Sequence, residues 1–322
     1  MELRTKVGIE SHGVTLSHHT PVLMLGSCFS DNIGALLADR LFNVVSNPLG
    51  TLYNPLSILS TVRRLADATE FTPADIFAHG NLHHSFDCHS SLSDTDPGRM
   101  IARLNRLTAD ASDFLRRTTV VFLTFGTARV YEHRLTSRVV ANCHKLPPQN
   151  FTRRMMSVDE VSDTIAATVS AIRSAAPAAE IFLTVSPIRH LRDGAHGNTL
   201  SKATLQLGIE KALPLCRDTH YLPAYEILND DLRDYRFYDT DMCHPSATAV
   251  NYIYEAFSEA FFTPPTRELA SKFLKFVKRL RHRPLTADTE AIRKFTAETE
   301  ILKEQMLGSY PYIAEAITRL KI

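Results

Sequence analysis

The sequence predicts an α/β protein with a doubly wound, mainly parallel sheet of five strands and helices on both sides of it. Two observations indicate this fold class. Five short apolar runs are nearly continuous instead of alternating with polar residues, which is typical of strands covered on both faces. Segments with helical spacing of apolar residues lie between those runs, and such a β-α-β-α order is typical of a doubly wound sheet.

The predicted strands share an apolar, β-branched composition and comprise residues 21–26, 42–45, 119–126, 180–187 and 220–225. Four stripes of apolar residues at helical spacing predict helices: Ile33, Leu36, Leu37 and Leu41; Ile101, Leu104, Leu107 and Phe114; Val161, Ile165, Val169 and Ile172; Val250, Ile253, Phe257 and Phe261. Ser157 and Glu160 predict a capping box for the third helix, and Ser246 predicts a cap for the fourth. We expect the first helix to begin near Ser30-Asp31.

The sequence pattern changes after residue 263. Residues 1–263 carry all five predicted strands, so we expect them to form the α/β domain. Residues 264–322 have a charged, helical pattern and are predicted to form a C-terminal extension that packs on this domain. We expect its apolar residues to be buried while the neighbouring lysines and arginines stay solvated; these apolar residues are Phe273, Phe276, Val277 and Leu280.

Composition narrows the class of partner. With 36 basic and 35 acidic residues, the net charge of +1 provides no long-range field for nucleic acid or an anionic membrane. No stretch approaches the roughly 20 apolar residues of a transmembrane helix, and the N-terminal segment lacks the apolar core of a signal peptide. Five scattered cysteines argue against a disulfide scaffold and fit a reducing compartment. We therefore expect a cytoplasmic protein with neither nucleic-acid nor membrane partners.

The stretch "LMLGSCFS" (23–30) ends the first predicted strand at Gly26 and continues with Ser27. At the carboxyl end of a central parallel strand, a tight turn projects the next side chain into the crevice above the sheet. The free N–H groups of the following helix favour a developing oxyanion in the same place. Ser27 is therefore the candidate nucleophile, and a serine nucleophile needs a base.

The candidate base lies in "YDTDMCHPSATAV" (238–250), just before the cap of the last core helix. Asp241 precedes His244 by three residues, a spacing that lets its carboxylate reach one imidazole nitrogen and leaves the other nitrogen to accept a proton. Asp239 is an alternative carboxylate. The same spacing is also compatible with a pair that merely caps a turn.

Together these features resemble the SGNH hydrolase superfamily, and "GSCFS" resembles the signature of the GSCFA family, a bacterial branch of it. The resemblance continues in "NPLGTLYNP" (47–55), "TFGTARVYE" (124–132), "NCHKLP" (142–147), "SPIRHLRDG" (186–194), "DMCHPS" (241–246) and "HRP" (282–284). It implies a three-layer, flavodoxin-like domain without a cofactor, in which Ser27, His244 and Asp241 act as nucleophile, base and partner of the base. Superfamily members hydrolyse or transfer acyl groups on small esters, lipids or carbohydrates.

Two departures from the superfamily pattern concern the nucleophile and the oxyanion hole. The usual aspartate between glycine and serine is missing, and Cys28 follows Ser27. The resemblance implies oxyanion donors from the Ser27 N–H, from a glycine for which Gly50 is the candidate, and from an asparagine. Ala128 stands in the asparagine place. The candidate replacements are Thr127, Asn54, Asn47 and Asn142.

Further polar residues in the predicted strand-end loops are weaker candidates for substrate binding: Asn142, His144, Lys145, Arg189 and His190. Such loops commonly carry sites, but the same residues are equally compatible with ordinary loop hydrogen bonding. His84 and Ser85 rank lower, in a segment expected to form a lid or a packed surface loop.

Three functions are compatible with the sequence. The leading one is a serine-dependent hydrolase or acyltransferase acting on an O-acyl ester, acylated carbohydrates included. The second is a non-catalytic module that binds glycans or small molecules, since the lost asparagine weakens the case for catalysis. In the third, Cys28 is a thiol nucleophile or a metal ligand together with Cys143, His144, Cys243 and His244. Because adjacent side chains point apart at a strand-to-turn junction, we expect Cys28 to pack beneath the helix. We expect no metal.

Overall fold

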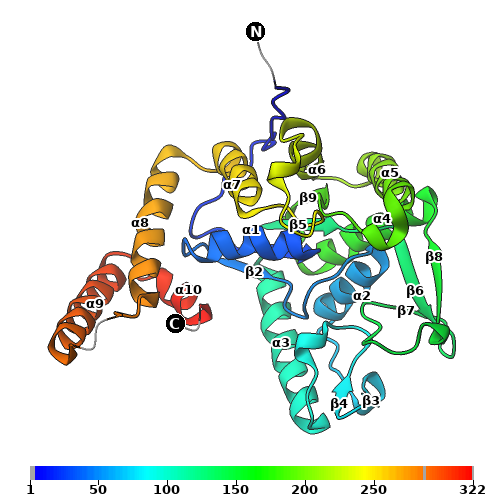
Figure 1. Ribbon diagram of the computed structural model, residues 1–322, viewed down its shortest axis with the longest axis horizontal. Coiled ribbons are helices and arrows are strands. Elements are labelled where there is room, and N and C mark those ends of the chain that lie inside the picture. The colour runs from blue at the N-terminus through cyan, green and yellow to red at the C-terminus, as the bar shows by residue number, and fades with distance from the viewer. Residues whose placement is uncertain (1–3, 286–287, 321–322) are drawn as a thin grey trace.

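The computed structural model describes residues 4–285 and 288–320 and confirms the α/β fold with a five-stranded parallel sheet (Figure 1). The strands are β1 (Val22–Gly26), β2 (Val44–Ser46), β5 (Val120–Phe125), β9 (Glu180–Val185) and β10 (Thr219–Tyr221). Each overlaps one of the predicted runs. Their order in the sheet is β10-β9-β5-β1-β2, and all pairings are parallel.

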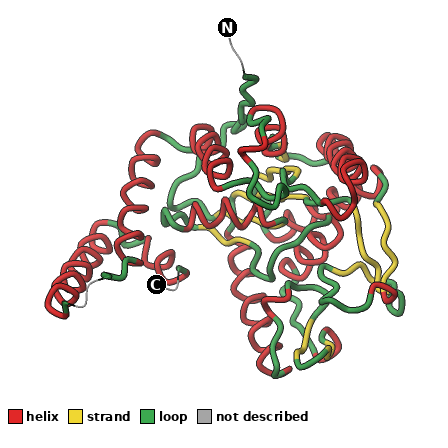
Figure 2. The backbone as a smooth tube through the Cα atoms, viewed as in Figure 1, coloured by secondary structure: helices red, strands yellow, loops and turns green. Residues whose placement is uncertain are grey.

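Helices cover both faces of this sheet, as Figure 2 shows. One face is covered by α2 (Pro55–Ala66), α3 (Pro97–Arg117), α4 (Val158–Ala175) and α5 (Gly194–Ala212), and the other by α1 (Cys28–Ala38) and α7 (Ala247–Phe261). Along β5, Val121 and Leu123 enter the first core while Val120 and Phe122 enter the second. Because successive strand residues point to opposite faces, a strand with a core on each face needs a continuous apolar run.

The predicted caps of two helices form with one difference. The Ser157 hydroxyl accepts the N–H of Glu160 at 3.1 Å, and the Ser246 hydroxyl accepts the N–H of Ala249 at 3.3 Å. The Glu160 carboxylate does not complete a capping box, because it accepts two hydrogen bonds from Arg154, each 2.7 Å long.

The start of α1 differs from the prediction in a way that matters for the site. The helix begins at Cys28 and not near Ser30-Asp31. The reason is that the Ser27 hydroxyl accepts the N–H of Phe29 at 3.3 Å, so Ser27 is the N-cap and Cys28 is the first helical residue. The turn after β1 is therefore tighter than expected.

Two small antiparallel sheets were not predicted. One contains β6 (Arg129–His133), β7 (Arg138–Val140) and β8 (Phe151–Met155), in the order β7-β6-β8. The other is a hairpin of β3 (Phe77–His79) and β4 (Leu82–His84). These strands are short and rich in arginine and histidine, so a search for apolar runs does not detect them.

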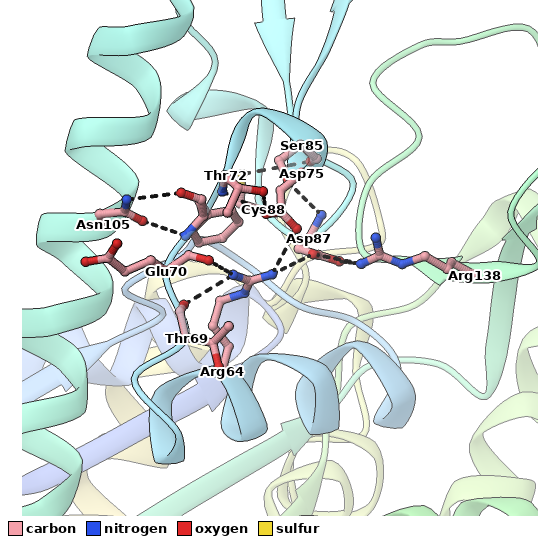
Figure 3. A network of polar contacts seen from close by, with 11 residues as sticks. Arg64, Thr69, Glu70, Thr72, Asp75, Ser85, Asp87, Cys88, Asn105 and Arg138 are labelled. Atoms are coloured by element: carbon pink, nitrogen blue, oxygen red, sulfur yellow. Dashed lines mark hydrogen bonds and ion pairs between the residues drawn. The ribbon is translucent and has the colours of Figure 1, made fainter.

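Figure 3 shows the polar network that anchors the irregular segment 69–98. The Arg64 guanidinium, on α2, lies 3.2 Å from the Asp87 carboxylate and 3.4 Å from that of Asp75. It also donates to the carbonyls of residues 69 and 70. Arg138, on β7, donates to both carboxylate oxygens of Asp87 at 3.0 Å. The network thus joins the segment to α2 and to the small sheet.

The C-terminal extension is helical, as expected, with α8 (Pro264–Arg281), α9 (Thr289–Ser309) and α10 (Ile313–Arg319). The predicted apolar residues of α8 join a separate core with Leu41 and Ile313: Phe273, Phe276 and Val277 are buried in it, and Leu280 packs against it. An ion pair of 2.7 Å between Arg281 and Asp39 adds a contact to the sheet unit. Division into two domains at residue 263 stays a prediction.

A short helical turn, α6 (Ala224–Glu226), follows β10. All five cysteines are free thiols. None of the helices within residues 4–285 and 288–320 combines the length and apolarity needed to cross a bilayer.

Candidate active site

A cavity of about 380 Å³ lies where the loops after β1, β5 and β9 meet. The chain runs outward from β1 to β2 and then back across to β5, so β1 and β5 flank the point where the strand order reverses. Ligands of open α/β sheets bind at such points, beyond the carboxyl ends of the strands. Three larger surface hollows, of about 490, 650 and 830 Å³, have no histidine among their described lining residues. The smaller cavity is lined by Cys28, Tyr53, Asn54, Thr127, Arg129, Tyr131, Val140, Ala141, Asn142, Cys143, Arg153, Ile188, Arg189, His190, Arg192, Asp193 and His244.

The structure brings Asp241 and His244 together as a hydrogen-bonded pair. Nδ1 of His244 lies 2.6 Å from Oδ2 of Asp241, and Oδ1 of Asp241 accepts the N–H groups of Cys243 and His244 at 2.9 Å each. These hydrogen bonds, first the backbone N–H and then the ring of His244, lower the pKa of Asp241 to about 2. The ionised carboxylate therefore holds the imidazole with Nδ1 protonated, which leaves Nε2 to accept a proton.

Asp239, the alternative partner of His244, forms its hydrogen bonds within the turn that contains it. Its carboxylate accepts the N–H of Thr240 at 2.7 Å, and its N–H donates to the carbonyl of His244 at 2.8 Å. The N–H of Arg189 donates to the carbonyl of Cys243 at 3.1 Å and so ties this loop to the loop after β9. The backbone thus places His244 over the carboxyl edge of the sheet.

Ser27 and Cys28 occupy different environments. Ser27 is 1% exposed, its hydroxyl is used as the α1 cap, and its N–H donates to the carbonyl of Thr124 at 3.0 Å. Cys28 lines the cavity together with His244. Its side chain also packs against the core under α1, so the expected packing beneath the helix accounts for only part of its surroundings. Cys28, and not Ser27, thus lines the cavity.

The surroundings of Cys28 favour its protonated form at rest. Burial, followed by the nearby charge of Asp31, raises the pKa of the Cys28 thiol to about 11, against smaller opposing effects of the first N–H groups of α1 and of Lys202. Lys202, on α5, is itself buried, and burial lowers its pKa to about 7. Its ammonium donates to the carbonyls of Gly126 and Ser186 at 2.7 Å each, which pins the ends of β5 and β9 beside the cavity. Cys28 therefore needs a base to become a nucleophile.

Asn54 is oriented as a hydrogen-bond donor toward the cavity. Its side-chain oxygen accepts the N–H of Ser57 at 2.9 Å and caps α2. Its Nδ2 group makes no hydrogen bond within the described part of the chain, and the residue lines the cavity. The N–H of Cys28 is at the first position of α1, where no intrahelical acceptor exists. These two groups are suited to receive an oxyanion.

Other predicted donors are used inside the fold. The N–H of Gly50 donates to the carbonyl of Asn47 at 2.7 Å, and a Cβ on Gly50 would lie 2.2 Å from that of His89. Asn47 accepts the N–H of Gly26 and donates to the Asp31 carboxylate, each at 2.8 Å. Gly50 and Asn47 therefore shape the turn after β2.

Thr127 and Asn142 also line the cavity. The N–H of Thr127 donates to the carbonyl of Tyr53 at 2.9 Å, and its hydroxyl lies 2.9 Å from that of Ser201, so its polar groups are engaged. The Asn142 side-chain oxygen accepts the N–H of His144 at 2.8 Å. Asn142 therefore resembles Asn54: each lines the cavity with its acceptor engaged, while its Nδ2 group makes no hydrogen bond within the described part of the chain.

The weaker substrate-binding candidates divide into two groups. Asn142, Arg189 and His190 line the cavity. His144 is instead buried inside the irregular segment, with Nε2 2.6 Å from the carbonyl of Ser85 and a pKa lowered by burial to about 4. Lys145 is exposed to solvent. The His84 ring lies against that of His144, tilted by 35° with ring centroids 4.6 Å apart, and belongs to the same interior.

Several cavity residues were not anticipated from the sequence. They are Tyr53, Arg129, Tyr131, Arg153, Arg192 and Asp193. Arg129 and Arg153 come from β6 and β8, so placing them requires knowledge of the small sheet. Arg192 and Asp193 lie in the stretch "SPIRHLRDG", and this motif is the sequence signal that could have identified them as site residues.

The metal alternative requires Cys28, Cys143, His144, Cys243 and His244 to come together. Among the described residues, no group of three or more histidine, cysteine, aspartate or glutamate side chains is arranged to hold an ion. Cys28, Cys143 and His244 line the cavity, whereas His144 is held at Ser85.

Comparison with known proteins places the chain in a family. No curated protein matches it. A solved carbohydrate esterase family 2 enzyme with a carbohydrate-binding domain, from Corynascus thermopiles (Myceliophthora fergusii), is similar at a TM-score of 0.40 and 16% identity, covering 77% of this chain and 67% of that chain. That similarity is too low to inform on activity. The GSCFA family model matches residues 21–257, well over half of the chain, from the start of β1 into α7. The protein therefore belongs to the GSCFA family.

Proposed function

We propose that this protein is an acyl hydrolase or acyltransferase that acts on O-acyl esters, acylated carbohydrates among them, with Cys28 as nucleophile. The observation that supports this proposal is that the Cys28 thiol lines the same cavity as the imidazole of His244, which Asp241 orients at 2.6 Å. A thiol or hydroxyl, a base and an orienting carboxylate form the arrangement of nucleophilic acyl transfer.

In the first half-reaction, Nε2 of His244 takes the proton of the Cys28 thiol as the sulfur attacks the carbonyl carbon of the ester. The carbonyl oxygen becomes an oxyanion and receives hydrogen bonds from Nδ2 of Asn54 and from the N–H of Cys28. Collapse re-forms the carbonyl and breaks the bond to the alcohol oxygen, which takes the proton from His244. An alcohol leaves and a thioester remains on Cys28.

In the second half-reaction, His244 deprotonates water or an acceptor alcohol, which attacks the thioester carbonyl. The Cys28 sulfur leaves and recovers the proton from His244, so the enzyme returns to its starting state. Asp241 stabilises the imidazolium in both steps without taking a proton itself. Because burial keeps the Cys28 thiol protonated, proton transfer to His244 must accompany the attack.

Ser27 is the alternative nucleophile, and its hydroxyl would have to give up the α1 cap to act. The test compares Cys28→Ala, Cys28→Ser and Ser27→Ala for turnover of a 4-nitrophenyl acetate substrate and for trapping of the acyl-enzyme by mass spectrometry. We expect the acyl group on Cys28, loss of turnover in Cys28→Ala, and turnover within a few-fold of wild type in Ser27→Ala. Loss of turnover in Ser27→Ala with retention in Cys28→Ala would assign the nucleophile to Ser27.

A ligand-binding protein without turnover is the second candidate. It is favoured by the geometry at rest, in which no hydrogen bond joins the Cys28 thiol to His244 within residues 4–285 and 288–320. Equal, background-level rates for the wild type and all three variants across a panel of esters would favour this candidate over the enzyme.

A further inference from the structure

The cavity is lined by four arginines and a single carboxylate. The arginines are Arg129, Arg153, Arg189 and Arg192, and the carboxylate is that of Asp193, whereas the chain as a whole is nearly neutral, with a net charge of +1. The cavity lining thus carries a surplus of positive charge. Low-dielectric walls strengthen the field of such a cluster inside a cleft.

Two of these arginines share the one carboxylate. The Asp193 side chain is 1% exposed, lies 3.4 Å from Nε of Arg129 and is in direct contact with Arg153. One negative charge therefore balances only one of the two guanidinium groups. Nε of Arg129 is moreover buried without a hydrogen-bond partner among the described residues. This trio retains a net positive charge.

The other two arginines have neutral neighbours. Arg189 lies 3.2 Å from the amide oxygen of Asn229 and 3.4 Å from the hydroxyl of Tyr238. The Arg192 guanidinium lies over the Tyr131 ring, 5.9 Å from its centroid. Neither forms an ion pair with a carboxylate within residues 4–285 and 288–320. Their charges thus add to the surplus.

No other cavity group compensates for this charge. Burial lowers the pKa of His190 to about 4, so its ring is neutral at neutral pH, and its Nε2 is buried without a hydrogen-bond partner among the described residues. The Asp241 carboxylate is engaged by His244. Clustered, partly desolvated cations are costly unless an anion joins them.

We infer that this cavity binds a substrate carrying an anionic group, a carboxylate or a phosphate, held by Arg189 and Arg192 beside the Arg129–Asp193–Arg153 trio. Planar guanidinium groups match the paired oxygens of both anions. The inference rests on the proposed function, because it places the anion on the acid or alcohol part of the ester that Cys28 attacks.

Binding is measured first, without chemistry, by titration calorimetry of the Cys28→Ala protein. The probes are 4-hydroxybenzoate, 4-hydroxyphenyl phosphate and the neutral, similarly shaped 4-hydroxybenzamide. We expect at least one anion to bind about tenfold or more tightly than the amide. A hydrogen bond to a charged group contributes more free energy than a tenfold difference in affinity requires. We also expect this preference to shrink as salt is added. The two anions compared with each other distinguish a carboxylate from a phosphate site.

Variants assign the effect to the cavity. Arg192→Gln and Arg189→Gln are each expected to weaken anion binding about tenfold and to leave amide binding unchanged. Arg63→Gln, at an exposed position on α2, is the matched control and is expected to change neither. Equal affinity for anions and amide, or equal effects of all three substitutions, would overturn the inference.

Turnover separates this inference from the proposed function. The wild-type protein is assayed with 4-acetoxybenzoate and 4-acetoxybenzamide. Anion binding that depends on Arg192, without turnover of either ester, would support the inferred anion site and contradict the proposed enzymatic function. Turnover that depends on Cys28 but does not discriminate between the two esters would support the proposed enzymatic function and contradict the inferred anion site.

Discussion

Two polar regions of this molecule look alike in composition but differ in how their groups are paired. In the network around Asp87, the carboxylate accepts from both Arg64 and Arg138, and Arg64 also donates to two backbone carbonyls (Figure 3). In the cavity at the sheet edge, within the described part of the chain, Nε2 of His244 and Nδ2 of Asn54 have no hydrogen-bond partner. The first region is saturated and holds a loop, while the second has donors and acceptors available to a ligand.

Two histidines make the difference concrete. His144 and His244 each follow a cysteine, so their local sequences are alike. Both ring nitrogens of His144 are engaged, by Ser90 at 3.3 Å and by the carbonyl of Ser85 at 2.6 Å. Among the residues that the structure describes, only Asp241 engages the His244 ring, at one of its two nitrogens. A base must keep one nitrogen available for a proton, and His244 meets that requirement.

The largest expected effect tests this contrast directly. His244→Gln should lower kcat/KM by about 10³–10⁴-fold because the general base is lost. The matched variant His144→Gln, in the saturated network, should leave kcat/KM within a few-fold of wild type. The measurement is steady-state ester hydrolysis by protein shown to be folded. Equal losses in the two variants would remove the distinction between the regions.

Asn54 comes next, because it combines a capping role with a donor role. Asn54→Ala should lower kcat by about 10²–10³-fold, the usual effect of removing one oxyanion donor. Asn54→Asp keeps an acceptor for the Ser57 N–H and so preserves the cap, but it removes the donor. We expect the aspartate variant to lose activity while its melting temperature stays close to that of wild type. Retained activity in both variants would mean that the oxyanion is held by other groups.

A substitution in the saturated network around Asp87 is expected to lower the stability of the protein and to leave catalysis unchanged. Asp87→Asn removes the negative charge between Arg64 and Arg138 and is expected to lower the free energy of unfolding by about 3 kcal/mol. Asp67→Asn, at the end of α2, is the control and should change it little. Urea unfolding measures both. A drop in kcat per folded molecule larger than the drop in stability would show that the network also shapes the cavity.

Acid pH should weaken the saturated region through His144. Its folded pKa, lowered to about 4 by burial, lies below the ordinary value of 6.5 of the unfolded chain. The neutral ring therefore contributes stability above pH 6.5, and this contribution is lost as the pH falls toward 4, by about 2–3 kcal/mol in total. Unfolding measured at several pH values should show a smaller acid loss in His144→Gln than in wild type. Identical profiles would place the acid sensitivity elsewhere, and His18 and His190, whose pKa values are lowered in the same way, are then the groups to replace.

Much of the fold is readable from local patterns, and the exceptions have identifiable causes. The central strands β1, β5 and β9 lie in nearly continuous apolar runs, because burial on both faces favours apolar residues along the strand. The edge strands β2 and β10 only overlap such runs. The strands of the small sheet carry polar residues such as Arg153 and Glu132, because one side of that sheet faces the cavity or solvent. Their partners are set by contacts between distant segments, which a local pattern does not contain.

The candidate site divides in the same way. The spacing of Asp241 and His244 was sufficient to predict their pairing, because three residues of one turn bring the two side chains within reach. The choice between Ser27 and Cys28 was not predictable in the same manner. It depends on where α1 begins, and that start is determined by a cap hydrogen bond and by packing of the strand against Thr124.

By itself, the sequence determined the layers of the sheet, the helical extension and the carboxylate–histidine pair, because apolar periodicity and short-range spacing act within a few residues. Only the tertiary structure decided which residues share a cavity: it brings Cys28, and not Ser27, together with Asn54, His244 and four arginines. The physical reason is that side-chain direction at a strand–helix junction, and the meeting of loops from β1, β5 and β9, follow from long-range packing and not from neighbouring residues.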